Sequence, residues 1–396
     1  MERFENIPYT RPNIQHIKEE FLGYVNQIKE AKNYGEQQNA IKKINKINAH
    51  VDTAINIAYV RNSINTEDAF YDAEKSYFDE NMPVISDLNF EYYKALNASK
   101  YRKNLEEEFG KQLFTVAEFS VKSFDKSIMD DLVEENKLSS EYSKLVASAQ
   151  IEFDGKVLNL SQLTPYTQSA DRAVRKKAIE AKYDFVEKNS QQFDEIYDKL
   201  VKLRDKMAKK MGFKNYVELG YLKMQRSDYN PEMVSNYRKQ ILEYVVPLVS
   251  KIRKKQAKRL DLEKLKFYDN SYFYPSGNPK PKGDAQWIIN NGKKMYKELS
   301  KETDEFFTFM TNKNLMDLET KKGTDIGGYC TFLADYGAPF IFSNFNGTSG
   351  DIDVLTHEAG HAFQVYNSRH FSISEYFWPT HESAEIHSMS MEFFTW

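Results

Sequence analysis

The sequence contains a single cysteine, Cys330, so no internal disulfide can form, as is typical of proteins from a reducing compartment. No apolar run approaches the roughly 20 residues that a membrane-spanning helix needs. The first residues, Met1–Pro8, also lack the apolar stretch of a signal peptide. These absences predict a cytoplasmic protein with no membrane partner. Without a second cysteine nearby, Cys330 is interpreted as a small buried apolar residue rather than a nucleophile.

A large net charge is also absent, because 55 Lys and Arg nearly balance 58 Asp and Glu, which leaves a net charge of -3. The basic run from Lys251 to Arg259 resembles a nucleic-acid patch at first sight. Helical spacing spreads such charges over a solvated face, and acidic residues follow at Asp261 and Glu263. The composition therefore predicts no nucleic-acid partner.

Glycine and proline are sparse in the first part of the chain, where apolar residues recur every three or four positions. This period predicts helices from residue 13 to about 110 and from 125 to about 148. At 396 residues the chain exceeds a typical single core. We therefore expect two lobes or one large helical body, with residues 1–150 as an N-terminal helical lobe and residues 151–396 as a catalytic region.

The period changes after residue 150. An Asp-Gly pair between β-type residues at 151–160 predicts a hairpin. Helical patterning resumes with Ser169 as the expected N-cap and continues to about Met211, and another long helix should begin near Pro231. Residues 327–332 and 339–345 read as short strands before a turn at 346–351.

The most informative segment is His357-Glu358-Ala359-Gly360-His361. Residues four apart lie on one face of a helix, so His357 and His361 can reach one metal ion about 2 Å from each imidazole nitrogen. Glu358 would then stand beside a metal-bound water as the general base. This HExxH spacing predicts a zinc peptidase, in which an edge strand beside the metal helix pairs with an extended substrate. Tyr329 and Phe345 flank that strand and are candidate substrate contacts.

A catalytic zinc usually takes three protein ligands, so one more residue is needed. The extended pattern HExxHxxGxxH is excluded because Gln364 and Asn367 occupy its Gly and His positions. The downstream residues that could bind zinc are His370, Glu375, His381, Glu382, Glu385 and His387. A helix beginning two residues after Pro379 would put Glu385 and Glu392 on one face, Glu385 as ligand and Glu392 as hydrogen-bond acceptor for a ligand histidine. The spacing alone leaves Glu385 open against Glu382 and His381, and His387 is a further candidate for substrate contact.

Several segments resemble the oligoendopeptidase F branch of the thimet oligopeptidase family. The segments that carry the resemblance are 347–348, 357–363 and 385–392, together with 160–166, 171–175 and 327–330 upstream. The resemblance implies a mainly α, two-lobed zincin-type metallopeptidase with a small β element beside the metal helix. It further implies a narrow channel for oligopeptides, one zinc ion (Zn2+) per chain on His357, His361 and Glu385, and Glu358 as the base. The expected reaction is hydrolysis of peptide bonds in short oligopeptides by Glu-assisted attack of a zinc-bound water.

One departure from the family concerns the C-terminus, because the family continues beyond the helix in which this sequence stops at Trp396. We therefore expect the C-terminal part, which contributes tyrosine and histidine side chains to the family's site, to be missing. The alternative to an enzyme is then a non-catalytic, metal-loaded peptide-binding fragment, or one part of a split enzyme. In that case its partner is a second chain or the missing C-terminal segment.

Overall fold

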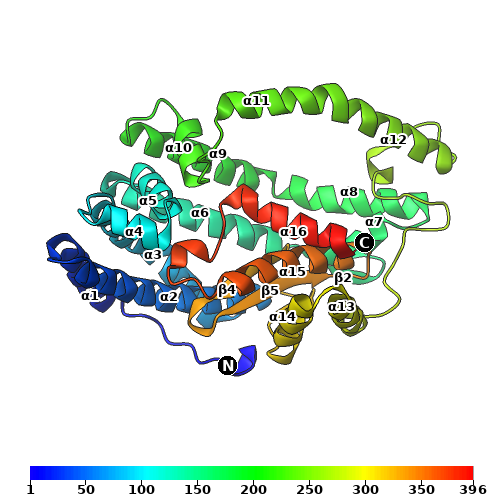
Figure 1. The fold of residues 1–396 in the computed structure, drawn as a ribbon. Helices are drawn as coiled ribbons and strands as arrows, with labels where there is room; N and C mark the ends of the chain where they lie inside the picture. The colour runs from blue at the N-terminus through cyan, green and yellow to red at the C-terminus, as the bar shows by residue number, and fades with distance from the viewer. Residues whose placement is uncertain (396) are drawn as a thin grey trace.

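The computed structural model describes residues 1–395 and consists mainly of α-helices (Figure 1). The first part of the chain forms the predicted run of helices: α1 (Ile14–Glu30), α2 (Tyr34–Ile64), α3 (Ala69–Asn97), α4 (Arg102–Phe109) and α5 (Gln112–Lys122). The first three begin where the side chain of Asn13, Asn33 or Asp68 accepts a hydrogen bond from a free backbone N–H group. Their apolar faces share one core, in which Phe21 and Tyr92 are completely enclosed.

The predicted hairpin follows the next helix, α6 (Met129–Ala147). Strands β1 (Ile151–Phe153) and β2 (Lys156–Leu158) pair antiparallel. Asp154 and Gly155 connect them with φ of 53° and 71°, so both residues of the two-residue turn are left-handed. A tight hairpin requires that conformation at these positions, which confirms the sequence prediction.

The helical patterning after the hairpin is confirmed, but its predicted N-cap is wrong. The chain forms α7 (Leu160–Thr167), α8 (Arg172–Lys188), α9 (Ser190–Lys210) and α10 (Tyr216–Lys223). Helix α8 is capped by Asp171, whose side chain accepts from the backbone N–H groups of Ala173 and Val174. Ser169 lies before this helix, and its hydroxyl accepts a 3.2 Å hydrogen bond from the N–H of Asp171, outside the helix. A carboxylate nearer to the helix start therefore takes the role expected of the hydroxyl.

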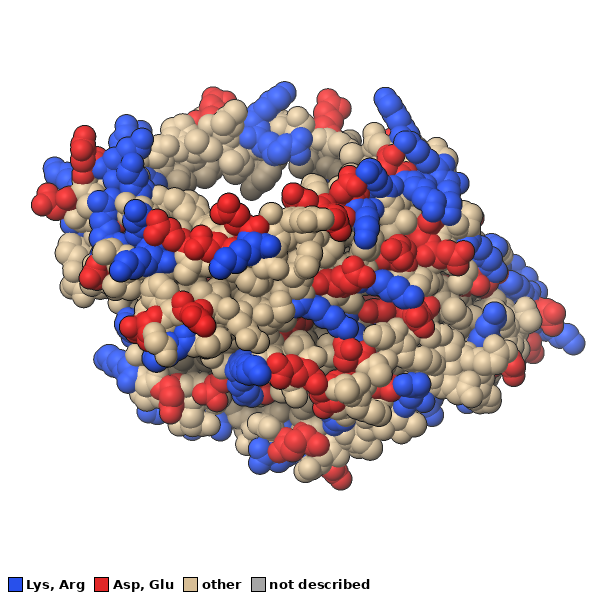
Figure 2. Space-filling view, turned by 180° about the vertical axis from the view of Figure 1, so that it is seen from behind, with Lys and Arg blue, Asp and Glu red and all other residues tan. Residues whose placement is uncertain are grey.

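Helices α11 (Pro231–Gln240) and α12 (Val246–Arg259) and the π-helical turn η3 (Ile241–Val245) between them form an arch along one side of the molecule (Figure 1). Pro231 occupies the first turn, where the predicted helix begins. No residue of α11 or η3 is buried. Figure 2 shows an opening between this arch and the body of the molecule.

The last third of the chain builds a small sheet between helices. After α13 (Ala285–Leu299) and α14 (Lys301–Asn312) come β3 (Met316–Glu319), β4 (Tyr329–Leu333) and β5 (Ala338–Phe345). The strand order is β3-β5-β4, with β5 parallel to β3 and antiparallel to β4. Strand β5 is therefore central and almost completely buried, whereas β4 is an edge strand.

Two helices complete the described chain, α15 (Gly350–Ser368) and α16 (His381–Thr395). Helix α15 packs on β4 and β5, and α16 packs along α15 (Figure 1). The N-terminal turn η1 (Phe4–Asn6) closes the same core, since the ring of Phe4 lies 4.2 Å from that of Phe340 between centroids. In residues 1–395 no helix is both long and apolar enough to cross a membrane. The two-lobed arrangement and its boundary at residue 150 stay predictions.

Candidate metal centre

The site lies between α15 and α16, which approach each other unusually closely at Gly360. A Cβ atom built on Gly360 would lie 2.6 Å from the Cα of Ser388 and 2.8 Å from the backbone oxygen of His387. Real Cβ atoms do not come that close to backbone, so only glycine allows this separation of the helices. The close approach brings the side chains that α16 carries next to the histidines of α15. Gly360 belongs to the predicted motif, but its packing role was not predicted, although a glycine inside a helix is a signal of close packing.

Three side chains converge across this contact. His357 and His361 extend from consecutive turns of α15, and Glu385 extends from the second turn of α16. One ligand atom from each of the three lies within 4.8 Å of the others. The carboxylate Oε2 of Glu385 is 3.2 Å from Nε2 of His357 and 3.7 Å from Nε2 of His361. Two imidazoles and one carboxylate are the donor set of a catalytic zinc site, so the residues present fit that ion.

Glu392 contacts His357 on the ring nitrogen opposite the proposed metal position. Its Oε1 lies 2.6 Å from Nδ1 of His357, on the ring nitrogen that does not face Glu385. This contact selects the tautomer in which Nδ1 carries the proton and Nε2 presents its lone pair to a metal. Glu385 and Glu392 thus contact the same imidazole from one face of α16, which is the arrangement expected from their spacing.

Burial shifts the pKa values of Glu358 and His361 on α15. Glu358 is only 7% exposed, and this burial raises the pKa of its carboxyl to about 7, with a smaller opposing effect of His357. A carboxyl with that pKa can both accept and return a proton near neutral pH. Burial also lowers the pKa of His361, which favours the neutral imidazole that a metal requires.

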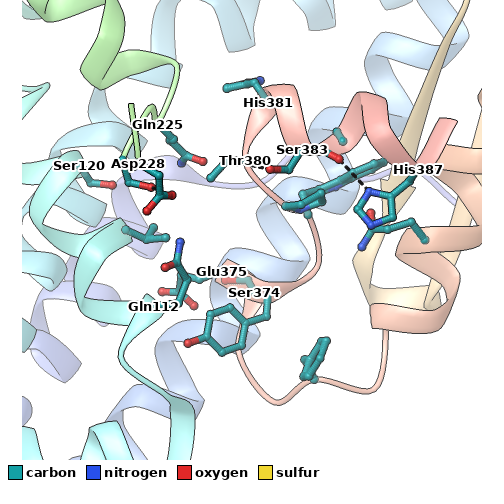
Figure 3. Close-up of a pocket in the computed structure, with 18 of the residues that line it drawn as sticks. Gln112, Ser120, Gln225, Asp228, Ser374, Glu375, Thr380, His381, Ser383 and His387 are labelled. Carbon is teal, nitrogen blue, oxygen red and sulfur yellow. Dashed lines mark hydrogen bonds between the residues drawn. The ribbon is translucent and has the colours of Figure 1, made fainter. Parts of the chain in front are cut away.

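A cavity of about 830 Å³ reaches the site from one side, and Glu385 is part of its wall. His387 lines the same cavity, and its Nδ1 lies 2.9 Å from the backbone oxygen of Ser383 (Figure 3). Tyr329 and Cys330, on the edge strand β4, line a second cavity of about 450 Å³. Phe345 is 7% exposed and packs in the core on the central strand β5, so the structure does not bring it to either cavity.

Two further residues singled out in the sequence, Glu382 and Cys330, have no part in the metal centre. Glu382 accepts a hydrogen bond of 2.7 Å from Nε of Arg226, so it ties α16 to the segment after α10 instead of facing the histidines. Burial raises the pKa of the Cys330 thiol well above its usual range, and the charge of Glu358 adds to this effect. A protonated thiol is a poor nucleophile, in agreement with the interpretation that Cys330 is not one, although the residue is partly exposed rather than buried as predicted. No sequence signal pointed to Arg226.

Comparison with known proteins identifies the class to which this fold and site belong. Residues 4–124 match the Peptidase M3 N-terminal domain, and residues 165–281 and 289–396 match Peptidase family M3. The chain therefore belongs to peptidase family M3. Its similarity to solved structures places it in the oligoendopeptidase F branch of that family, as the sequence resemblance predicted.

Three solved structures superimpose on the whole chain with a TM-score of 0.99. One, described as an oligoendopeptidase F from Bacillus anthracis str. Ames, is 55% identical, and this chain covers 73% of it. PZ peptidase A with inhibitor 2 is 54% identical, and another structure described as oligoendopeptidase F is 50% identical, each covered to 70%. An oligoendopeptidase F from Enterococcus faecium, at 14% identity, shares the fold alone. The comparison with curated proteins found no match.

Proposed function

We propose that this protein is a zinc-dependent endopeptidase that hydrolyses peptide bonds in short oligopeptides. The observation that carries the proposal is that ligand atoms of His357, His361 and Glu385 converge within 4.8 Å of one another. The buried Glu358 lies on α15, the helix of the two histidines. Membership of peptidase family M3 supports the reaction class, and the oligoendopeptidase F branch supports peptides as the substrate. In this proposal the enzyme is cytoplasmic, because a single cysteine is typical of proteins from a reducing compartment.

Each polar residue of the site has a separate task in this proposal. His357, His361 and Glu385 would hold the zinc ion, and Glu392 would keep the ring of His357 in the tautomer that binds metal. A zinc ion bound there supplies Lewis acidity toward water and the peptide carbonyl. Glu358 takes the proton of the attacking water and passes it to the leaving amine, for which a pKa near neutrality is suited.

The substrate backbone has a place to pair beside this site. Strand β4 is the edge of the sheet and lies against α15, and Asn56 of α2 donates to the backbone oxygen of Phe332 near its end. Residues 329–331, at the start of the strand, border a cavity of about 450 Å³, and in this proposal an extended peptide pairs there as an additional strand. Tyr329 lies on this strand, and His387 lies in the wall of the neighbouring cavity. Both stay candidate substrate contacts in the proposal, whereas the buried Phe345 is left out of it.

The test is cleavage of an internally quenched fluorescent peptide by the zinc-loaded protein and by its Glu358→Gln variant. The glutamine keeps the shape of the side chain but cannot accept a proton, so we expect cleavage to be abolished while bound zinc remains one per chain. Turnover of the variant near that of the unmodified protein would exclude Glu358 as the base. A zinc-loaded protein that binds peptides without cleaving any of them would favour the alternative of a non-catalytic binding fragment.

A further inference from the structure

The larger cavity beside the metal centre has an unusual balance of charge. It lies between α5, the segment 225–228, the short helix η6 (Ser374–Tyr376) and the first turns of α16. Besides the hydroxyls of Tyr93 and Tyr376, its titratable side chains are three carboxylates and two imidazoles, those of Asp228, Glu375, Glu385, His381 and His387. Within residues 1–395, no lysine or arginine lines it. Glu385 is assigned to the metal, so two carboxylates remain without a role.

Glu375 is the more informative of these two. Both of its carboxylate oxygens are shielded from solvent, and neither accepts a hydrogen bond of normal geometry. Burial raises the pKa of Glu375 above its ordinary value, and its own backbone N–H, together with the nearby hydroxyls of Tyr93, Tyr92 and Ser374, opposes this only in part. The Oη of Tyr92 is buried as well. A buried carboxyl group in this state costs folding free energy that an incoming cation would offset.

The surrounding structure holds Glu375 in place. The backbone N–H and the hydroxyl of Ser374 both donate to Oδ1 of Asn45, at 2.7 and 2.9 Å. The hydroxyl of Tyr376 accepts a 3.0 Å hydrogen bond from the backbone N–H of Leu113. Helix η6 is therefore fastened on both sides of Glu375 to helices of the N-terminal part. A carboxylate fixed in this way is preorganised for a ligand.

Asp228 stands at the exposed side of the same cavity. Asp228 is exposed, and its Oδ2 accepts a 2.8 Å hydrogen bond from the hydroxyl of Ser227. In Figure 3, Asp228, Gln112 and Glu375 lie toward one side of the cavity and His387 toward the other. The two carboxylates without a metal role therefore lie away from the end at which α16 contributes His387.

We propose that Glu375, assisted by Asp228, forms a subsite for an organic cation carried by the peptide substrate, either its N-terminal ammonium group or a lysine or arginine side chain. The inference rests on the proposed function, because it takes the cavity beside Glu385 as the place where part of the peptide lies. It adds a preference for substrate charge that the metal centre alone does not produce. In this proposal Glu375 binds the cationic group of the peptide and takes no part in bond cleavage.

The test measures binding, so it does not depend on turnover. Fluorescent peptides are titrated into the zinc-loaded chain in a Glu358→Gln background. In the first arm a lysine is moved along an N-acetylated peptide, and each peptide is compared with its norleucine counterpart. In the second arm a free N-terminus is compared with an acetylated one in a peptide without lysine. We expect about 10-fold or tighter binding of the cationic member in at least one arm, since hydrogen bonds to charged groups have that strength.

The variant Glu375→Gln should reduce this ratio to less than about twofold, and the arm in which it does so identifies the source of the cation. The exposed Glu305→Gln removes the same charge on α14 and should leave the ratio unchanged. If Glu375→Gln does not fold, Asp228→Asn is measured in its place, because Asp228 is exposed. We expect this variant to reduce the same affinity ratio, but by less. An unchanged ratio, no charge preference in either arm, or no binding of any peptide overturns the subsite. Failure of the unmodified protein to cleave any peptide refutes only the proposed peptidase function.

Discussion

His357 is oriented by contacts on both of its ring nitrogens, with Glu385 on one side and Glu392 on the other. Replacing His357 removes one of the three proposed ligands and leaves the carboxylates of Glu385 and Glu392 without the imidazole between them. We therefore expect His357→Ala to lose nearly all bound zinc, and the unmodified protein to hold one ion per chain. Metal analysis after dialysis measures both values. Stoichiometric zinc in the variant would show that the ion binds elsewhere.

Glu392 touches no metal in the proposed site, so its replacement tests orientation alone. In Glu392→Gln the amide still fills the space beside His357, but it loses the charge that fixes the Nδ1 proton. We expect zinc affinity to fall about 10- to 100-fold, as is usual when such a supporting carboxylate is lost. Competition with a chelator of known affinity measures the change, with Glu305→Gln as the matched surface control. Equal affinity in both variants would mean that Glu392 does not orient the ring.

At the scale of the elements, the distance between α15 and α16 controls the site. Gly360→Ala adds a single methyl group where only 2.6 Å is available to the backbone of α16. The helices must separate, and Glu385 moves away from the two histidines. We expect both weaker zinc binding and a lower melting temperature, although residue 360 is no ligand.

Gly23→Ala is the control for this substitution, because Gly23 also lies inside a helix but a Cβ there meets nothing within 4 Å. Alanine should stabilise α1 there by about 0.5–1 kcal/mol and leave zinc binding unchanged. Chelator competition and thermal unfolding of the two variants measure the difference. Full zinc affinity in Gly360→Ala would show that the site tolerates separation of its helices.

A second element contact depends on pH. Asp269, in the short helix η4 (Phe267–Asp269), is 0% exposed and is bound by Arg172 and Arg175 of α8. Burial would raise its pKa, but the two guanidinium groups and the backbone N–H of Lys266 outweigh burial and lower the pKa to about 2. The unfolded value is about 3.9, so the network stabilises the fold above about pH 4, and this contribution is lost as the pH falls toward 2.

We expect Asp269→Asn to cost about 3–5 kcal/mol at neutral pH, because it leaves the buried Arg175 without its counter-charge. Asp205→Asn, which breaks an exposed pair with Lys209, should cost less than about 1 kcal/mol. Denaturant unfolding at pH 7 and pH 3 measures both values, and the loss from Asp269→Asn should be smaller at pH 3. A pH-independent difference would contradict the ionic explanation.

The sequence predicted elements better than contacts between them. The helices, the hairpin at Asp154-Gly155 and the strands β4 and β5 carry their signals within a few residues, so their positions were accessible. The N-cap of α8 was wrong because Ser169 and Asp171 compete within one turn and only the folded geometry decides between them. Glu385 could not be separated from Glu382 and His381 by spacing, because the choice depends on how α16 rotates against α15 and on the Arg226 side chain that binds Glu382.

At the scale of the whole molecule, buried side chains are distributed unevenly. The helices of the N-terminal core are anchored by enclosed side chains, whereas α11 and η3 bury none. Exposed apolar side chains continue along the arch: Met233, Tyr237, Leu242, Tyr244, Val245, Val246, Leu248, Val249 and Ile252. We expect the amide hydrogens of residues 231–245 to exchange much earlier than those of α2. Hydrogen exchange followed by mass spectrometry tests this, and equal protection would contradict it.

The contact of the N-terminal turn with the sheet has a consequence for synthesis on the ribosome. Glu5 accepts a hydrogen bond from Asn314, 309 residues later, and the ring of Phe4 packs against that of Phe340. At about 5–20 residues per second, roughly 15 to 60 s pass before the ribosome adds the partner of Glu5. The helices α1 to α5 can assemble during that interval, but η1 must wait with Phe4 exposed to water. The core around the metal-binding helices therefore closes only late in translation.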